Sequence, residues 1–373
     1  MTKLRVLHLY RTYFPETQGG LQESIRQLCF ATVTHDVVNT IFVLARRPEP
    51  YYMDLPEAKL VRARSWIEVA SCDIGAWAAV RRCRDAAEDC DIIQVHYPWP
   101  FADVLLPFIR LRKQPVLVTY VSDIVRQKGL GLIYSPLRRH LLGVAARIVV
   151  SSPNYVASSE TLKRYQHKVV CIPHCLEELA PPESKLVTYW ETRLGRDFFL
   201  FVGVLRYYKG LNVLLAAAGQ SNQPIVIVGE GPEGEQLRRE AAARGLSNVH
   251  FVGAVADVDK RALFSLCRGV VFPSHLRSEA FGMTLLEGAQ FAKPLISCEI
   301  GTGTSWINLN GETGLVVPPS NADALAQAMH LLANDDQLCR RLGSGARARW
   351  KQYFTPEVVG VAYRKLYEEL LAA

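Results

Sequence analysis

Two glutamates eight positions apart, Glu279 and Glu287, have the spacing in this 373-residue chain that most directly suggests chemistry. They lie in SEAFGMTLLEGAQFAKPLIS (residues 278–297), with a Phe-Gly turn between them. If a helix begins near Gly282, its first free backbone amides start at about Met283, and amides at a helix N-terminus attract phosphate. Glu287 then lies more than one turn further in, where a carboxylate can accept two hydrogen bonds from a vicinal diol such as a ribose. An anion site, a diol site and a second acid predict a nucleotide-sugar pocket.

The spacing of the glutamates is not sufficient alone, because an amphipathic helix with two solvated acids has the same pattern. A second segment, FFLFVGVLRYYKGLNVLLAA (residues 198–217), favours the pocket. It begins as a continuous apolar strand, turns at Gly203, presents Arg206 and Lys209, and enters a helix after Gly210. This order places cations at the carboxyl edge of a parallel sheet, where open α/β folds bind their ligands.

A glycine pair, Gly19 and Gly20, follows the predicted strand RVLHLY (residues 5–10) and opens a helix. Paired glycines at such a place let the backbone approach a phosphate closely. A tight turn explains the same pair equally well. The pair therefore adds to the pocket hypothesis without deciding it.

A histidine, His96, ends a predicted strand in QVHYPWPFAD (residues 94–103). A strand-terminal histidine is either a packed, hydrogen-bonded residue or part of a site at the sheet edge, and we leave a role toward an acceptor sugar open. Trp99 and Phe101 beside it either stack on a sugar ring or fill the core.

Together these segments resemble the retaining nucleotide-sugar glycosyltransferases of family 4, over nearly the whole chain. The resemblance extends to SDIVRQK (122–128), VVSSPNY (149–155), VGEGPEGEQL (228–237), EIGTGTSWIN (299–308) and NGETGLVVPPSNADAL (310–325). The stretch 301–308 looks most like mannosyl- and rhamnosyltransferases that build bacterial surface polysaccharides such as O-antigen. The resemblance implies an α/β chain of the GT-B fold, in which two doubly wound Rossmann-like domains face a central cleft.

Residue roles follow from the same resemblance. Catalytic roles are implied for Arg206, Lys209 and Glu279. Binding of the nucleotide sugar is implied for Gly19, Gly20, Gly203, Gly229, Phe281, Gly282, Met283, Thr284 and Glu287, and contacts in the donor-sugar or acceptor region for His96, Val121, Asp123 and Arg126. Fixed cations and helix amides would stabilise the departing phosphate as a metal does elsewhere, so we expect neither a metal nor a cofactor.

One position departs from the family. Its members usually carry a histidine immediately before Ser-Asp, where it contacts the donor sugar near the C6 hydroxyl, whereas this chain has Val121 before Ser122 and Asp123. Either the donor differs or the activity is weakened. A valine offers an apolar wall that suits a C6 methyl, so we expect a 6-deoxyhexose donor such as GDP-rhamnose, with GDP-mannose as the second choice.

A D-x-D triplet, Asp257 to Asp259, matches the metal-binding signature of another glycosyltransferase fold. Three residues match easily by chance. The triplet precedes the helical run 260–267, where one aspartate would serve as an N-cap and a second acid would suit the helix dipole. We therefore favour capping over metal binding.

Charge and composition limit the partners. The net charge is +7, and the first 190 residues carry most of the excess, with 24 Lys and Arg against 18 Asp and Glu. Basic clusters at 81–82, 110–113 and 138–139 suit an anionic membrane surface or a lipid-linked acceptor glycan, and no motif supports nucleic acid.

The nine cysteines form no paired framework. With no secretory signal and no membrane-length apolar run, the chain is expected in the cytoplasm, soluble or peripheral at the inner face of the membrane.

Short apolar runs alternate with helical patterns throughout, which is typical of parallel sheets with crossover helices. The predicted strands are 5–10, 39–44, 92–96, 115–120, 148–151 and 169–172 in the first half, and 198–203, 224–228, 249–252, 269–272, 294–297 and 314–317 in the second. We expect an acceptor-side domain at 1–176, a linker at 177–196 and a nucleotide-sugar domain at 197–354. By resemblance, a C-terminal helix at 355–373 would cross back to the first domain.

The sequence thus predicts a metal-independent, retaining hexosyltransferase that uses a nucleoside-diphosphate sugar, GDP-linked by resemblance, and a lipid-linked or growing surface-polysaccharide glycan. Two alternatives stay open. One is a non-catalytic partner subunit of a polysaccharide assembly complex, suggested by the missing histidine. The other is a GT-B phosphorylase or epimerase, in which phosphate or water would replace the glycan.

Overall fold

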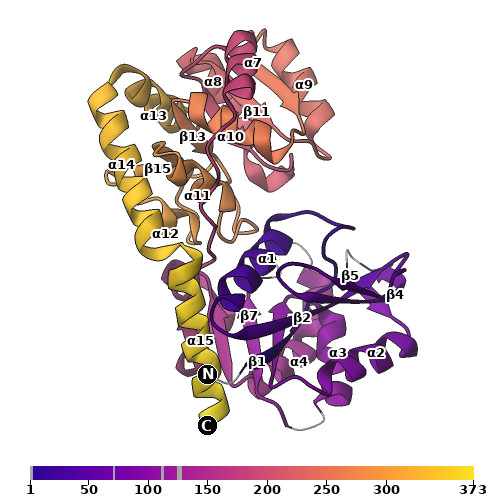
Figure 1. The fold of residues 1–373 in the computed structure, drawn as a ribbon. Helices are drawn as coiled ribbons and strands as arrows, with labels where there is room; N and C mark the ends of the chain where they lie inside the picture. The colour runs from indigo at the N-terminus through magenta and orange to yellow at the C-terminus, as the bar shows by residue number, and fades with distance from the viewer. Residues whose placement is uncertain (1–2, 70–71, 111–112, 124–127) are drawn as a thin grey trace. The chain divides into compact units, whose positions relative to one another are not determined.

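The computed structural model describes residues 3–69, 72–110, 113–123 and 128–373 (Figure 1). The chain divides into two compact units. The first unit contains Met1–Cys175 together with Thr355–Ala373, and the second contains Leu176–Phe354. Each unit is built on its own sheet, so each is described separately.

The sheet of the first unit has the strand order β3-β4-β2-β1-β6-β7-β8-β9, with β5 paired to β4. Its strands are β1 (Leu4–Leu9), β2 (Val37–Ala45), β3 (Tyr52–Asp54), β4 (Lys59–Val69), β5 (Cys72–Gly75), β6 (Ile92–Tyr97), β7 (Val116–Tyr120), β8 (Arg147–Val150) and β9 (Val169–Cys171). Strands β3 and β5 run antiparallel to β4, and the other pairs are parallel. The strand order reverses between β1 and β6, which is the kind of switch point where open sheets bind ligands.

The six strands predicted for the first half are confirmed within one or two residues at most ends, but β3, β4 and β5 were not predicted. Strand β4 reads KLVRARSWIEV, in which charged residues interrupt the apolar ones. Buried parallel strands are recognised by nearly continuous apolar runs, and an outer strand lacks that signal. The prediction therefore missed the outer part of this sheet.

The helices of the first unit are α1 (Gly20–Val33), α2 (Trp77–Ala87), α3 (Pro100–Ile109), α4 (Lys128–Val144), α5 (Pro153–Ser158), α6 (Glu160–Lys163) and α15 (Pro356–Ala372). The C-terminal helix α15 buries Val359, Tyr363 and Tyr367 in the same core as Leu28 of α1 and Ile92 of β6. The hydroxyl of Tyr367 also donates a hydrogen bond to Gln94 Oε1 at 2.6 Å. The last helix of the chain thus completes the first unit.

The sheet of the second unit is parallel throughout, with the order β12-β11-β10-β13-β14-β15. Its strands are β10 (Phe199–Val202), β11 (Ile225–Val228), β12 (Val249–Gly253), β13 (Gly269–Phe272), β14 (Leu295–Cys298) and β15 (Gly314–Val317). All six predicted strands of the second half are confirmed. The strand order reverses between β10 and β13, so a ligand site is expected at the carboxyl ends of these two strands.

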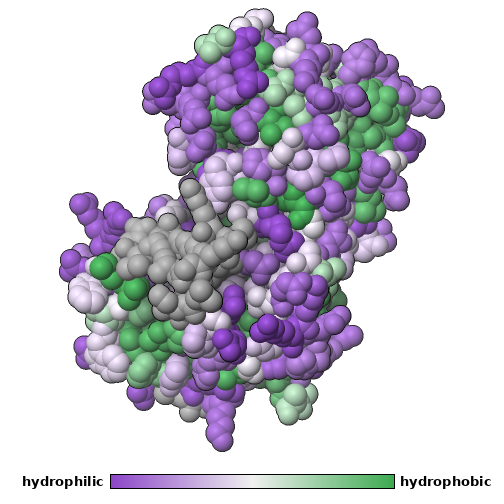
Figure 2. All heavy atoms as spheres, turned by 180° about the vertical axis from the view of Figure 1, so that it is seen from behind, coloured by the Kyte–Doolittle hydropathy of each residue, from purple (hydrophilic) through white to green (hydrophobic). Residues whose placement is uncertain are grey.

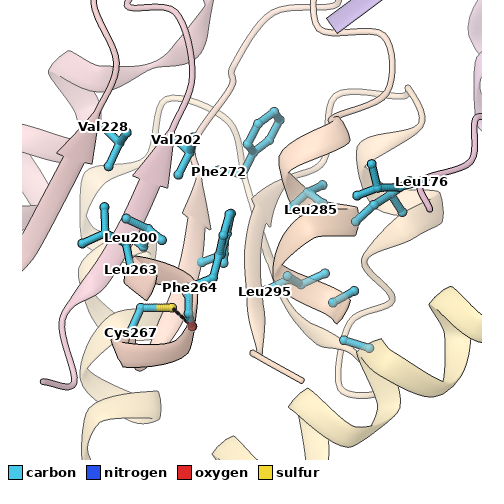
Figure 3. Close-up of a cluster of buried hydrophobic side chains, with 14 of the residues drawn as sticks. Leu176, Leu200, Val202, Val228, Leu263, Phe264, Cys267, Phe272, Leu285 and Leu295 are labelled. Carbon is cyan, nitrogen blue, oxygen red and sulfur yellow. Dashed lines mark hydrogen bonds between the residues drawn. The ribbon is translucent and has the colours of Figure 1, made fainter. Parts of the chain in front are cut away.

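Helices cover both faces of the second sheet. They are α7 (Ser184–Leu194), α8 (Leu211–Ser221), α9 (Gly234–Ala243), α10 (Asp257–Leu266), α11 (Met283–Gln290), α12 (Thr304–Ile307), α13 (Ala322–Asn334) and α14 (Asp336–Tyr353). Alternate residues of β10 enter different cores, because side chains of a strand point to opposite faces. Leu200 and Val202 join Phe272 and Leu285 in one cluster, shown in Figure 3, and Phe201 joins the other.

The stretch 177–196, predicted as a linker, contains helix α7 and belongs to the second unit. Trp190 of this helix is buried, and its Nε1 donates a hydrogen bond to Asp259 Oδ1 at 2.8 Å. The polar, proline-rich composition of residues 177–185 suggested a linker. This stretch leads directly into the amphipathic helix α7, which begins at Ser184. The contact between Trp190 and α10 is what assigns the segment to the second unit.

None of the described helices is both long and apolar enough to cross a membrane. The eight cysteines whose side chains are described are all free thiols.

Candidate active site

The loop after β10 and the loop after β13 bring together a lysine and a glutamate that are 70 residues apart in the sequence. Lys209 ends a short 3-10 helix (Tyr207–Lys209), and its Nζ forms an ion pair with Glu279 Oε2. Ser274 Oγ donates a hydrogen bond to the same oxygen at 3.1 Å. The Lys209 ammonium also lies 4.6 Å from the centre of the Phe272 ring. Both charged side chains are largely buried, with 11% and 12% of their surface exposed.

This pair lies at the carboxyl edge of the second sheet, where the strand–loop–helix pattern predicted Lys209, and the strand order reverses at this point. Arg206 lies in the same loop, but its side chain is exposed, and its backbone oxygen accepts a hydrogen bond from the Lys209 amide. The structure therefore brings Lys209 and Glu279 together and leaves Arg206 facing solvent. Ser274 was not identified from the sequence, because a single serine in a loop carries no spacing signal.

The two predicted binding glycines Gly203 and Gly229 lie against each other at the ends of β10 and β11. A Cβ added to Gly229 would lie 2.0 Å from the Gly203 carbonyl oxygen, which no side chain can tolerate. Glycine at 229 is thus required by the close approach of these two loops. Any contact of either residue with a nucleotide sugar stays a prediction.

The segment between the two glutamates forms a tight turn and then a helix, as expected. Gly282 has φ +100° and precedes α11, which begins at Met283. This φ lies in the region that favours glycine. The Leu285 amide donates to the Gly282 carbonyl at 2.9 Å, so this amide is already hydrogen-bonded within the first turn of the helix. The expected phosphate-binding amides are therefore those at the very start of the helix, Met283 and Thr284.

Side chains on either side of this turn hold it in place. Thr284 Oγ1 donates a hydrogen bond to the Val202 carbonyl at 3.1 Å, which ties the first turn of α11 to the end of β10. Phe281 is buried and meets the ring of Phe354 edge to face, with 6.1 Å between ring centres. The Phe281 side chain is therefore part of the core, and any contact of Phe281 with a sugar stays a prediction.

Glu287 lies on α11, as predicted, and its carboxylate is engaged by a cation. Lys260 Nζ lies 3.2 Å from Glu287 Oε1 and 2.7 Å from Asp257 Oδ1. Burial alone would lower the pKa of Lys260, but the negative charges of Glu287 and Asp257 outweigh it and raise that pKa. Lys260 was not identified from the sequence. A ribose diol that binds Glu287 would meet a carboxylate already fixed in orientation by this lysine.

The D-x-D triplet has partners within the protein. Helix α10 begins at Asp257 with Ala256 as its N-cap, so the prediction that an aspartate of the triplet caps the helix is wrong. Both aspartates lie in the first helical turn, where the helix dipole favours acids. Asp257 pairs with Lys260, and Asp259 accepts from Trp190. The described residues contain no group of three or more His, Cys, Asp or Glu side chains arranged to hold a metal ion.

A further carboxylate organises the loop after β14. Glu299 Oε1 accepts hydrogen bonds from the Gly301 amide and from Ser305 Oγ, both at 2.9 Å. Arg277 Nη1, from the loop after β13, donates to the Gly301 carbonyl at 3.0 Å. Glu299 opens the EIGTGTSWIN segment, so its motif could have identified it as a loop-organising residue.

The glycine pair of the first unit opens α1, as expected. Gly19 is the N-cap, with an extended φ of −175°, and Gly20 is the first helical residue. A Cβ added to Gly20 would meet no atom within 4 Å. Among the described residues of the unit, none therefore requires glycine at position 20, and close approach of a phosphate stays a prediction.

The other predicted residues of the first unit lie near the carboxyl ends of β6 and β7. His96 is buried, and so are Trp99 and Phe101, which belong to the protein interior. Val121 is half-buried, and its amide donates to the Tyr97 carbonyl at 3.1 Å. Arg126 lies outside the described residues.

Asp123 is held by three protein groups. Its Oδ1 accepts hydrogen bonds from the hydroxyls of Tyr120 at 2.7 Å and Ser159 at 2.9 Å. The Asp123 amide donates to the Tyr155 hydroxyl at 2.6 Å. These contacts fix the loop that carries Val121, so Asp123 has at least a positioning role there.

Comparison with known proteins places the chain in a family. The family described as glycosyl transferases group 1 matches residues 189–349. An O-antigen chain mannosyltransferase C of Escherichia coli is 47% identical over 99% of both chains. The D-rhamnosyltransferase WbpZ of Pseudomonas aeruginosa is 45% identical over 94% of this chain and 92% of its own length.

Solved structures agree on the fold. A sucrose-phosphate synthase from Thermosynechococcus elongatus has a TM-score of 0.82 and 22% identity, covering 99% of this chain and all of that one. Anabaena HepE, solved with UDP and glucose, has a TM-score of 0.77 and 16% identity, covering 98% of this chain and all of its own. With two Rossmann-like units and curated relatives 45–47% identical over nearly its whole length, the chain belongs to the group 1 glycosyltransferases and has the GT-B fold.

Proposed function

We propose that this glycosyltransferase moves a mannose or a 6-deoxyhexose of the D-rhamnose type from a GDP-linked donor to a lipid-linked or growing surface-polysaccharide glycan. The names of two relatives support the sugar, since one is an O-antigen chain mannosyltransferase and the other a D-rhamnosyltransferase. The observation that carries the proposal is the buried Lys209–Glu279 pair at the switch point of the second sheet.

The proposed reaction retains the configuration at the anomeric carbon. The bond from the anomeric carbon to the phosphate oxygen breaks, and an acceptor hydroxyl forms its bond to the same face. The hydroxyl proton passes to the departing phosphate. Negative charge grows on that phosphate, where Lys209 supplies a fixed cation, the first amides of α11 supply donors, and the exposed Arg206 can reach a ligand without breaking an ion pair. Glu279 would then orient sugar hydroxyls together with Ser274.

The second carboxylate has a separate task. Glu287 would accept two hydrogen bonds from the ribose diol of the nucleotide. Lys260 already contacts Glu287 Oε1 at 3.2 Å, and this contact holds the carboxylate in one orientation. The two glutamates would thus bind different parts of the donor, with the sugar at Glu279 and the nucleoside at Glu287.

A panel of nucleotide sugars tests the proposed donor. The purified protein is incubated with GDP-, UDP- and dTDP-sugars and a lipid-linked glycan, and products are detected by mass spectrometry. We expect transfer from GDP-mannose or GDP-rhamnose and not from the UDP- or dTDP-sugars. Turnover with inorganic phosphate in place of the glycan would instead identify a phosphorylase.

Chelation tests the proposed independence from metal. Activity should survive EDTA, and Asp257→Ala should leave it within a few-fold of the native protein. Loss of activity in EDTA that manganese restores, together with loss in Asp257→Ala, would overturn this part of the proposal.

We also propose that the first unit docks on an anionic membrane surface, where a lipid-linked glycan would be found. Helix α3 exposes Val104 and Phe108, and Trp77 of α2 meets Phe108 edge to face. Arg81 of α2 and Arg110, which directly follows α3, are exposed cations. Figure 2 shows apolar patches between hydrophilic side chains on the surface of this unit, in the lower part of the view.

Liposome sedimentation tests the docking. The protein should bind vesicles that contain phosphatidylglycerol more strongly than neutral vesicles, and salt should release it because exposed charges are screened over about 8 Å at physiological ionic strength. Equal binding to both vesicle types would contradict the proposal and favour a soluble glycan.

A further inference from the structure

A small cavity lies inside the first unit, beside the switch point of its sheet. His96 of β6 and Thr119 of β7 line it from the sheet, Ser24 from α1, Tyr363 from α15, and His174 from the segment after β9. The volume open to the centre of a water molecule is about 10 Å³. A space of this size holds one water molecule or one hydroxyl group.

A chain of hydrogen bonds leads to this cavity and begins at Asn39 of β2. The Asn39 Nδ2 group faces the Cys29 carbonyl at 3.1 Å and the Glu57 carbonyl at 3.5 Å. Carbonyl oxygens only accept, so Nδ2 must be the group that faces them. The Asn39 Oδ1 atom therefore faces His8, whose Nε2 lies 3.0 Å away.

The orientation of Asn39 fixes the protons on both histidines. Because Asn39 Oδ1 only accepts, His8 must carry its proton on Nε2, and its Nδ1 is then an acceptor. His8 Nδ1 lies 3.2 Å from His96 Nε2, so His96 must also carry its proton on Nε2. The remaining nitrogen, His96 Nδ1, then bears a lone pair.

Burial keeps both imidazoles neutral, as this assignment requires. Burial lowers the pKa of His8 to about 4. Burial also lowers the pKa of His96 well below its ordinary value, and the neighbouring His8 and His174 add to the effect.

His96 Nδ1 is buried and has no hydrogen-bond partner among the described residues. A buried acceptor without a donor is costly, by about 1–3 kcal/mol. The structure thus presents an oriented lone pair on a residue that lines a cavity with room for one hydroxyl.

We infer that the cavity receives a single sugar hydroxyl, which donates a hydrogen bond to His96 Nδ1, and that Asn39 and His8 position the imidazole for it. The inference rests on the proposed function, because a sugar substrate supplies the hydroxyl. His96 is then a specificity-determining residue. The hydroxyl belongs either to the donor sugar or to the glycan, and the experiment distinguishes these two sources.

Two substitutions at the same position separate the two ring nitrogens. In His96→Gln, the side-chain amide reaches the place of Nε2 and can still donate to His8, but nothing replaces Nδ1. In His96→Asn, the shorter amide places an oxygen near Nδ1 and loses the contact with His8. We expect His96→Gln to raise the KM of one substrate about tenfold with little change in kcat, and His96→Asn to raise it less.

The KM values of donor and glycan are measured separately, so the substrate whose KM rises is the source of the hydroxyl. Analogues of that substrate, each lacking one hydroxyl, should include one that the native enzyme and His96→Gln bind equally well. Equal KM values in the native enzyme and both variants would overturn the inference and assign the cavity to a bound water. So would equal losses in both variants that follow their melting temperatures.

Nitrogen NMR of the 15N-histidine-labelled protein gives a readout independent of turnover. His96 Nδ1 should resonate as an unprotonated nitrogen, and its signal should shift when the nucleotide sugar or the glycan is added. A proton on Nδ1, or no shift with either ligand, would contradict the inference. A native protein that transfers no sugar yet shows this shift would refute the proposed function and keep the binding site.

Discussion

The two sheets place different chemistry at equivalent positions. In each unit the strand order reverses once beside the first strand, between β10 and β13 in the second unit and between β1 and β6 in the first. The second unit places Lys209 and Glu279 there as a buried ion pair. The first unit places His8 and His96 there as buried imidazoles in contact with each other.

This difference matches two kinds of ligand. A fixed cation stabilises the charge that grows on a departing phosphate, and it acts strongly because it is shielded from water. A neutral imidazole offers one directed lone pair and suits a hydroxyl. On the proposed function, the switch point would serve charge stabilisation in one unit and neutral hydrogen bonding in the other, and four experiments can break or sharpen the comparison.

The largest effect is expected for the buried Lys209–Glu279 pair of the second unit. Lys209→Ala should lower kcat by about 10²–10³-fold, because one donor to a developing charge contributes about 2.7–4 kcal/mol. Initial rates at saturating donor measure the effect. Arg239→Ala is a matched control, since Arg239 is an exposed cation of the same unit that pairs only loosely with Glu235 at 3.7 Å. Comparable rates for the two variants would remove Lys209 from the catalytic machinery.

The buried, neutral histidine His8 at the switch point of the first sheet should affect how stability depends on pH. The pKa of His8 is about 4 in the folded protein, below its ordinary value of 6.5, because burial disfavours the charged form. The unfolded chain therefore binds the proton more tightly, and the free energy of unfolding should fall by about 3 kcal/mol as pH drops from 6.5 to 4. Urea titrations of the native protein and His8→Leu across this range measure the difference. The variant should show a shallower decline.

Asp103 provides a control of opposite sign in the same unit. Burial raises the pKa of this carboxyl to about 7, although a hydrogen bond from Tyr134 opposes the shift. The folded state then binds the proton more tightly, so this group adds stability as pH falls from about 7 toward 4. Asp103→Asn should remove that gain. Identical pH profiles for the native protein and both variants would show that neither group titrates abnormally.

A smaller effect is expected for the nucleoside end of the charged site. Glu287→Ala should raise the dissociation constant of the donor by about ten- to hundredfold, since hydrogen bonds to charged groups contribute about 1.5–3 kcal/mol. Calorimetric titration with the nucleoside diphosphate measures it. Because Glu287 also pairs with Lys260, the variant Lys260→Met is needed as a comparison. If Lys260→Met weakens binding as much as Glu287→Ala does, then Glu287 acts through the ion pair and not on the ribose.

The smallest effect is expected for Val121 of the first unit and concerns the preference between two donor sugars. Val121→His should shift the ratio of kcat/KM for GDP-rhamnose and GDP-mannose toward the mannose donor. An apolar pocket rejects an added hydroxyl by about a hundredfold at most, so some mannose transfer by the native enzyme is expected. A native preference for GDP-mannose, or a kcat/KM ratio that the substitution leaves unchanged, would contradict the hypothesis that Val121 selects a C6 methyl.

The sequence alone determined the framework of this protein. Twelve parallel strands were predictable because buried parallel strands are nearly continuous apolar runs, and Glu279 and Glu287 were correctly divided between a loop and a helix. Strand β4 was missed because Arg62 and Arg64 interrupt its apolar pattern. The boundaries of regular elements depend on neighbouring residues, which is why local sequence predicts them.

Only the tertiary structure decided which distant residues meet. Lys209 reaches Glu279 across 70 positions, and His8 reaches His96 across 88, because in each pair the two residues belong to strands or loops that become neighbours only in the folded sheet. Strand order is a property of the whole sheet, and no local pattern encodes it. The proton positions on His8 and His96 depend on one further distant residue, Asn39, so the orientation of the lone pair on His96 follows from the fold and not from the motif that contains it.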